Sequence, residues 1–141
     1  MSTIAYRGYL LHVSHYDPKW CAAKGGEWPF EPDVAIKVID AMAEVGMNVL
    51  VVDIADGVKY KSHPELERFY SADMESLRQV CDHAHARDID VVPKLNFSKS
   101  GRNRHDEWMQ PHASPLVFTW TLDRYWDVAA DLIKELVEVC R

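Results

Sequence analysis

The segment MNVLVVDIAD, residues 47–56, has the pattern of a strand buried inside a parallel sheet. Valines and a leucine follow one another up to Asp53, so that both faces of the strand are apolar. Strands of this kind lie in parallel sheets that are covered on both sides. Two other segments, GYLLHVSH (residues 8–15) and IDVVPKLNF (residues 89–97), have the same character. The sequence therefore predicts three parallel strands.

Helical patterns separate these strands. The first helix is predicted over about Pro32–Val45, because proline is favoured in a first turn and Gly46 follows as a C-terminal cap. The second begins after Ser71, a predicted N-cap, and the third covers about Leu122–Cys140. Helical spacing predicts three sets of core-facing side chains: Val34, Val38, Ala41 and Val45; Met74, Leu77, Cys81 and Ala84; and Trp126, Ala129, Ile133, Leu136 and Cys140.

The connections that follow the strands are long, and those that follow the helices are short. The long ones are predicted at His15–Glu31, Gly57–Ser71 and Ser98–Thr121. Long loops at the carboxyl ends of strands build the active-site face of a (β/α)8 barrel. A complete barrel takes at least about 200 residues, so a chain of 141 residues holds roughly its first three βα units.

The predicted fold class is therefore α/β, as a partial (β/α)8 TIM barrel with parallel strands. Residues 1–141 are expected to form a single domain, the N-terminal part of such a barrel. A small open α/β domain is the alternative that the same pattern allows.

The composition is that of an ordinary globular protein, with 48% hydrophobic and 27% charged residues. The net charge of −6 argues against a nucleic-acid partner, and the one basic cluster, KSGRNR at residues 99–104, lies in a predicted loop. No segment has the length of a membrane span, and the amino terminus lacks the pattern of a signal peptide. We therefore expect no membrane partner and a cytoplasmic location.

The three cysteines give no sign of a disulfide framework. Cys21, Cys81 and Cys140 are odd in number and far apart, and no two of them have the spacing of a zinc ribbon. Reduced thiols are the expectation that follows.

Three segments, taken in order, resemble the start of the barrel in family 20 β-N-acetylhexosaminidases: YRGYLLHVSHY (residues 6–16), MNVLVVDIADGVKYKSHPEL (residues 47–66) and ADMESLRQVCDHAHARDIDVVPKLNF (residues 72–97). That family shows an Arg-Gly before its first strand, an Asn-Val-Leu second strand, a Lys-Ser-x-Pro-x-Leu segment and an Arg-x-Ile-x-Val-x-Pro third strand. The resemblance implies a glycoside hydrolase, acting on O-glycosyl bonds of a carbohydrate substrate.

Two departures from the family fall at strand ends. His12 stands where the family commonly has Asp, and Lys94 and Asn96 stand where it has Glu and Asp. Both changes shift the charge of the expected sugar site in the positive direction. They are compatible with a different sugar, including an acidic one.

The resemblance assigns no catalytic residue to this chain. In the family an Asp-Glu pair closes the fourth strand, where the Glu is the general acid and the Asp orients the acetamido group of the substrate. The chain reaches only Arg141, where that strand would begin, and its one Asp-Glu dipeptide, Asp106-Glu107, follows no strand. We therefore expect strand 4 onward to be absent and the chain alone to have no turnover.

Seven side chains are candidates for substrate binding: Arg7, His12, Asp53, Asp56, Lys94, Asn96 and Trp108. Most of them end a predicted strand, which is where α/β proteins bind ligands. Arg7 matches the family's arginine that binds sugar hydroxyls, and a surface arginine at the start of the strand is an equally good interpretation. For Asp56 the Asp-Gly sequence favours a simple turn, whereas Trp108 is a candidate for stacking on a sugar ring.

Neither a metal nor a cofactor is expected. His83 and His85 diverge on a helix, and His12 and His15 lie on opposite faces of a strand. Neither pair therefore has the geometry of metal ligands.

Two functions remain open at this point. In the first, the chain is a fragment of a glycoside hydrolase that contributes part of a sugar site. It should then expose apolar side chains on its last helix and first strand and have low stability alone, because a half-barrel leaves strand edges unpaired. In the second, the chain is a complete small α/β module that binds a sugar or a protein without catalysis, and self-association through exposed barrel edges into a full barrel is a variant of it.

Overall fold

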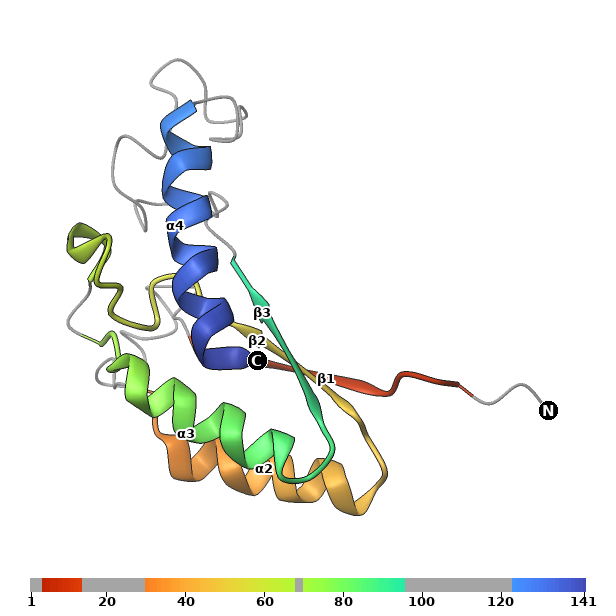
Figure 1. Cartoon of the computed structure of the whole chain (residues 1–141). Helices are drawn as coiled ribbons and strands as arrows, with labels where there is room; N and C mark the ends of the chain where they lie inside the picture. The colour runs from red at the N-terminus through yellow and green to blue at the C-terminus, as the bar shows by residue number, and fades with distance from the viewer. Residues whose placement is uncertain (1–3, 14–29, 68–69, 96–122) are drawn as a thin grey trace, which may run out of the picture.

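Three parallel strands and three helices alternate along the chain in the computed structural model, which describes residues 4–13, 30–67, 70–95 and 123–141. In chain order the elements are β1 (Gly8–His12), α2 (Pro32–Glu44), β2 (Val49–Asp53), the 3-10 turn η1 (Pro64–Leu66), α3 (Met74–His85), β3 (Asp90–Lys94) and α4 (Asp123–Cys140). The strands form one sheet in the order β1-β2-β3 (Figure 1). The predicted α/β class, the three βα units and the parallel strands are confirmed.

The register is continuous across the three strands. Register partners form two rows of side chains: Leu10, Val51 and Val92, and then, two residues further along, His12, Asp53 and Lys94. Side chains in a strand alternate between its two faces, so both rows lie on the same face of the sheet.

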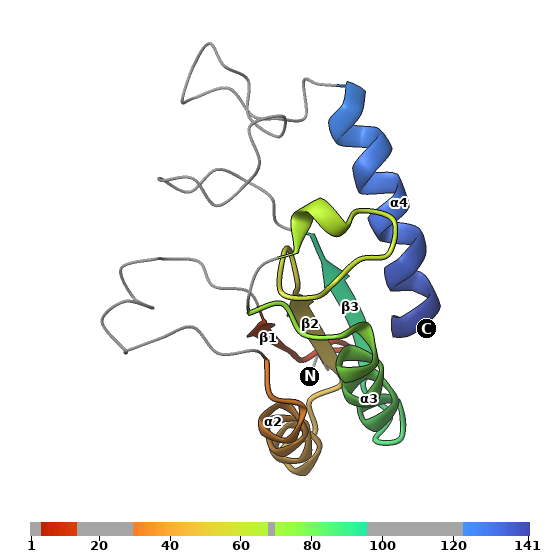
Figure 2. The ribbon, with the colours of Figure 1, turned by 90° about the vertical axis from the view of Figure 1, so that its left-hand side faces the viewer.

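Helices cover the other face of the sheet. Leu50 and Val52 of β2 are fully buried there, and α2 and α3 lie side by side while α4 lies next to β3 (Figures 1 and 2). The helices bury the following side chains in this core: Ala35, Ile39 and Met42 from α2; Leu77, Val80, Cys81 and Ala84 from α3; and Val128, Leu132, Leu136, Val139 and Cys140 from α4. None of the helices in the described ranges is long and apolar enough to cross a membrane.

The face with the two rows is more open than the sequence predicted. Leu10 and Val92, which flank the central strand, are each nearly half exposed. The prediction of strands buried on both faces is therefore wrong for β1 and β3. An apolar run shows that a strand has two apolar faces, but it does not show what covers the second one.

The core faces predicted for α2 and α4 are correct only in part. Val34 of α2 and Val45, which caps that helix, are exposed. On α4 the side chains of Trp126 and Ile133 are exposed, whereas Leu136 and Cys140 are buried as predicted. Both helices carry apolar residues at neighbouring positions, so two overlapping stripes fit the same helical spacing. The predicted face of α3 is correct.

Exposed apolar side chains occur on the last helix and the first strand, as a fragment of a larger barrel would show. Ile133 and Val137 on α4 are half exposed, and Tyr9 and Leu10 on β1 nearly so. These positions agree with the first of the two functions, which predicted apolar surface at both places.

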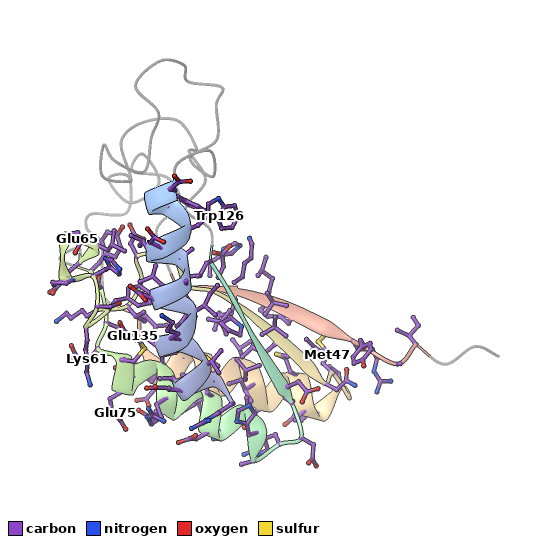
Figure 3. All side chains as sticks on the ribbon, turned by 45° about the horizontal axis from the view of Figure 1, so that its top comes forward. Met47, Lys61, Glu65, Glu75, Trp126 and Glu135 are labelled. Atoms are coloured by element: carbon purple, nitrogen blue, oxygen red, sulfur yellow. The ribbon has the colours of Figure 1, made fainter. Side chains whose placement is uncertain are left out.

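The loop that follows β2 is held against α4 by Glu135. Its carboxylate accepts hydrogen bonds from the backbone N–H groups of Lys61 at 2.9 Å and Ser62 at 2.8 Å, and from the Ser62 hydroxyl. Figure 3 shows Glu135 on α4 and Lys61 on the facing loop. Beside them, His63 Nδ1 lies 2.9 Å from Glu65 and His63 Nε2 lies 3.5 Å from Asp131.

These contacts stabilise the charged form of Glu135. Partial burial acts to raise its pKa, but the hydrogen bonds from Ser62 and Lys61 outweigh it, and the pKa is lowered from its ordinary value. The Lys-Ser-x-Pro-x-Leu segment thus has a structural role in this chain, because its backbone anchors the loop to α4.

We predict that Glu135→Gln destabilises the fold at neutral pH and not in acid. Because folding lowers the pKa of Glu135, its contribution is complete above the ordinary value of 4.5 and is lost as the pH falls through the lower folded value. The loss in free energy of unfolding should be about 1 kcal/mol at pH 7 and should shrink toward zero near pH 3. Urea unfolding at the two pH values measures it.

Glu75→Gln is the matched control, because Glu75 is a more exposed glutamate on α3 that makes an ion pair with Arg78. It should have little effect at either pH. A loss for Glu135→Gln that is equal at pH 7 and pH 3 would contradict the anchoring role of its carboxylate.

Candidate functional site

Each strand contributes its last residue to a single polar row. His12 ends β1, Asp53 ends β2 and Lys94 ends β3, and the three are register partners. Parallel strands bring their carboxyl ends to one edge of a sheet, which is where α/β folds bind ligands. The structure thus brings together three of the seven predicted binding residues in what we call the strand-end row.

Asp53 is the buried member of the strand-end row. Its side chain has 0% exposure, whereas those of His12 and Lys94 are 48% and 44% exposed. Lys94 Nζ donates a hydrogen bond to Asp53 Oδ2 at 2.6 Å, and His12 Nδ1 lies 3.5 Å from the same oxygen. A buried carboxylate is stable only when it is paired, so Lys94 compensates the charge of Asp53.

The row presents hydrogen-bonding groups to a ligand at its exposed ends. The ammonium of Lys94 carries three donors, and the imidazole of His12 can donate or accept according to its tautomer. Since both side chains are about half exposed, they can contact the hydroxyl or carbonyl oxygens of a bound molecule. The buried carboxylate between them fixes the position of the ammonium.

Asp56 belongs to a turn and not to the row. The N–H of Gly57 donates to the carbonyl of Ile54 at 2.7 Å, which closes the turn, and Ala55 has a φ of 41°. The turn interpretation of Asp56-Gly57 is therefore confirmed.

The carboxylate of Asp56 fastens this turn to the segment before α3. Tyr70 donates its hydroxyl hydrogen bond to Asp56 Oδ2 at 2.7 Å, and Ser71 Oγ donates to the Asp56 carbonyl at 2.6 Å. The prediction of Ser71 as the N-cap of α3 is therefore wrong, because its hydroxyl donates to the turn instead. Asp73 occupies the cap position. Tyr70 was not among the predicted residues, since no spacing in the sequence links it to Asp56.

Arg7 lies at the opposite end of β1 from His12. Its backbone N–H donates to Asn48 Oδ1 at 2.8 Å, and its carbonyl accepts from the N–H groups of Asn48 and Val49. The guanidinium lies beside Gly46, in the connection between α2 and β2. The structure therefore separates Arg7 from the strand-end row, in agreement with its interpretation as a surface arginine at the start of the strand.

The remaining two candidates, Asn96 and Trp108, lie outside the described residues. Within the described ranges, no group of three or more His, Cys, Asp or Glu side chains is arranged to hold a metal ion.

Solved structures of family 20 glycoside hydrolases have this fold. The β-N-acetylhexosaminidase from Bacteroides fragilis aligns with a TM-score of 0.63 and 16% identity over 95% of this chain. The chitobiase from Flavobacterium johnsoniae aligns with a TM-score of 0.60 and 17% identity over 95%. A family 20 β-N-acetylglucosaminidase aligns with a TM-score of 0.61 and 17% identity over 96% of this chain.

The alignments cover only part of those enzymes. This chain spans 29%, 22% and 34% of their respective lengths. It therefore has the fold of part of a family 20 glycoside hydrolase, as the resemblance implied. No family model and no curated protein matches the sequence.

We predict that Gly57→Ala disturbs the turn that follows the strand-end row. A β-carbon at Gly57 would lie 2.5 Å from the carbonyl oxygen of Val13 and 2.9 Å from that of Ile54, and these backbone atoms cannot rotate away as a flexible side chain would. The free energy of unfolding should fall by about 2 kcal/mol or more. Chemical denaturation followed by circular dichroism measures the change.

Gly8→Ala is the matched control, because a β-carbon there has its nearest contact at 3.4 Å, to the carbonyl oxygen of Val49. This substitution should cost less than about 1 kcal/mol. Equal losses for the two variants would show that the close approach at Gly57 is not the reason for the glycine.

Proposed function

We propose that this chain is part of a carbohydrate-active (β/α) barrel and that its strand-end row binds a sugar without catalysing a reaction. The observation that carries the proposal is the convergence of His12, Asp53 and Lys94 at the carboxyl edge of the sheet. The chain shares its fold with part of the family 20 glycoside hydrolases, and this similarity supports a carbohydrate as the ligand of that edge.

The charge of the row favours a neutral sugar over an acidic one. Lys94 supplies a positive charge, but Asp53 lies 2.6 Å from it and compensates that charge. The row can therefore bind a ligand through directed hydrogen bonds more than through a net positive charge. Hydroxyl and acetamido oxygens of an N-acetylhexosamine are suitable acceptors for the exposed ammonium.

The sugar site extends beyond the strand-end row in this proposal. Asn96 and Trp108 follow β3 in the sequence and add an amide and an aromatic ring. An aromatic ring stacks on the apolar face of a pyranose. Neither residue is needed for the contacts within the row.

No described side chain is assigned as general acid. Asp53 is engaged with Lys94, and Asp56 accepts the hydrogen bond of Tyr70. The proposed role of the chain is therefore binding, and catalysis requires carboxylates from another part of a barrel.

Further βα units are the proposed neighbours of the exposed apolar surface on α4 and β1. Self-association through the outer edge of β3 is a weaker alternative. The Lys94 carbonyl accepts from the N–H of Ile54, so the backbone of residue 94 points toward β2 and that of Pro93 points to the outer edge. Proline has no N–H to donate, so a strand added there would lack one ladder hydrogen bond.

We predict that Lys94→Gln weakens sugar binding about tenfold, because one charge-assisted hydrogen bond is lost. The measurement is an NMR titration of the isotopically labelled chain with N-acetylglucosamine, in which the amide signals of His12, Asp53 and Lys94 should move in the parent chain. Lys134→Gln, a lysine on α4 that pairs with Asp131, is the matched control and should leave the Kd unchanged.

Lys94→Arg is a second variant, which keeps the positive charge beside Asp53 and tests the proposal if Lys94→Gln does not fold. It should retain most of the affinity. The proposal fails if N-acetylglucosamine moves no signals of the row, or if folded Lys94→Gln binds the sugar as well as the parent does.

We further predict no hydrolysis of a chromogenic N-acetyl-β-glucosaminide by this chain, since no general acid is assigned in it. The expected release of the chromophore equals that of a buffer blank. Turnover above the blank that disappears in Glu107→Gln would contradict the prediction and would make Asp106-Glu107 the catalytic pair.

A further inference from the structure

Two cysteines that are distant in the sequence touch in the core. Cys81 of α3 and Cys140, the last residue of α4, are 59 positions apart, and their sulfur atoms lie 3.4 Å from each other. Both are free thiols and both are buried. We propose that Cys81 and Cys140 form a modification site, a reversible disulfide that ties α4 to α3.

The distance between the two sulfur atoms is compatible with a bond. A disulfide has its sulfur atoms about 2.05 Å apart, so the gap of 3.4 Å must close by about 1.4 Å. Closing it requires the two side chains to rotate about χ1. Sequence spacing gave no hint of the pair, because the contact depends on how α3 packs against α4.

Cys140 is the more reactive thiol of the pair. Cys81 donates its S–H to Cys140, and this hydrogen bond together with the nearby guanidinium of Arg78 lowers the pKa of Cys140. The same hydrogen bond and burial raise the pKa of Cys81. Arg78 Nη1 also donates to the carbonyl of Glu138 at 3.3 Å, which holds the guanidinium at the last turn of α4.

The position of Cys140 at the carboxyl end of α4 disfavours its thiolate, and the charge of Arg78 offsets this effect. The carboxyl end of a helix carries a partial negative charge that disfavours an anion. A guanidinium at that end supplies the opposite charge, and a thiolate beside a cation is the reactive form of cysteine.

The oxidant in this reaction is a small-molecule disulfide such as oxidised glutathione. The Cys140 thiolate attacks one of its sulfur atoms, forms a mixed disulfide and releases one glutathione thiolate. Cys81 then loses its proton and attacks Cys140 Sγ, which releases the second glutathione. Two electrons pass from the protein to the oxidant, and the two thiol protons end on two molecules of reduced glutathione.

The bond would change how firmly α4 is held. In the reduced chain α4 is fixed by packing and by polar contacts such as those of Glu135 with the loop after β2. A covalent link between residues 81 and 140 restricts the unfolded chain and so favours the folded arrangement. Oxidation should therefore stabilise the half of the molecule that contains α3 and α4.

The test uses the full chain with Cys21→Ser, which removes the third thiol. After incubation with oxidised glutathione, we expect both remaining thiols to disappear, the mass to fall by two hydrogen atoms and a proteolytic fragment to link Cys81 with Cys140. The Tm should rise by roughly 5 °C or more, and dithiothreitol should reverse every change.

The matched control adds Cys81→Ala, or Cys140→Ala if the first variant does not fold. Neither control can close the bond, so its Tm should not rise after the same treatment. The proposal is overturned if the two thiols of the Cys21→Ser chain stay titratable, if they accumulate separate glutathione adducts or disulfide-linked dimers, or if the bond forms without raising the Tm.

Discussion

The buried carboxylate of Asp53 is the constraint on which the carboxyl edge of the sheet depends. Asp53 ends the central strand with no exposure to solvent, and Lys94 from one neighbour compensates its charge at 2.6 Å. A slip of β3 by one residue would turn Lys94 to the other face of the sheet and leave the carboxylate without its ammonium. The ion pair therefore fixes the register of the same edge that offers His12 and Lys94 to a ligand.

The structure supports that edge from two sides. On the helix side, apolar packing of Leu50 and Val52 holds the central strand in place. Beyond the strand, the hydrogen bond between Asp56 and Tyr70 ties the following turn to the segment before α3, and Glu135 ties the next part of the loop to α4. Side chains that are fixed by packing and by further hydrogen bonds lose little freedom when a ligand binds, which suits the strand-end row to recognition.

The sequence was sufficient for the features that depend on local pattern. Apolar runs located the three strands, and Asp53 and Lys94 were expected at strand ends, where the structure places them. The core faces of α2 and α4 were predictable only in part, because Val34 and Ala35, or Trp126 and Val128, fit two equally regular stripes, although Leu136 and Cys140 lie in the core as predicted. The contacts Asp56–Tyr70 and Cys81–Cys140 depend on how separate elements pack, and no local pattern carries that information.

A crystal structure of the chain with N-acetylglucosamine would show whether the strand-end row is a sugar-binding surface. We expect a hexosamine ring over the carboxyl edge of the sheet, with a sugar oxygen within hydrogen-bond distance of Lys94 Nζ while the ammonium still contacts Asp53. A sugar bound away from this edge, or an edge at which Asp53 and Lys94 are not paired, would contradict it.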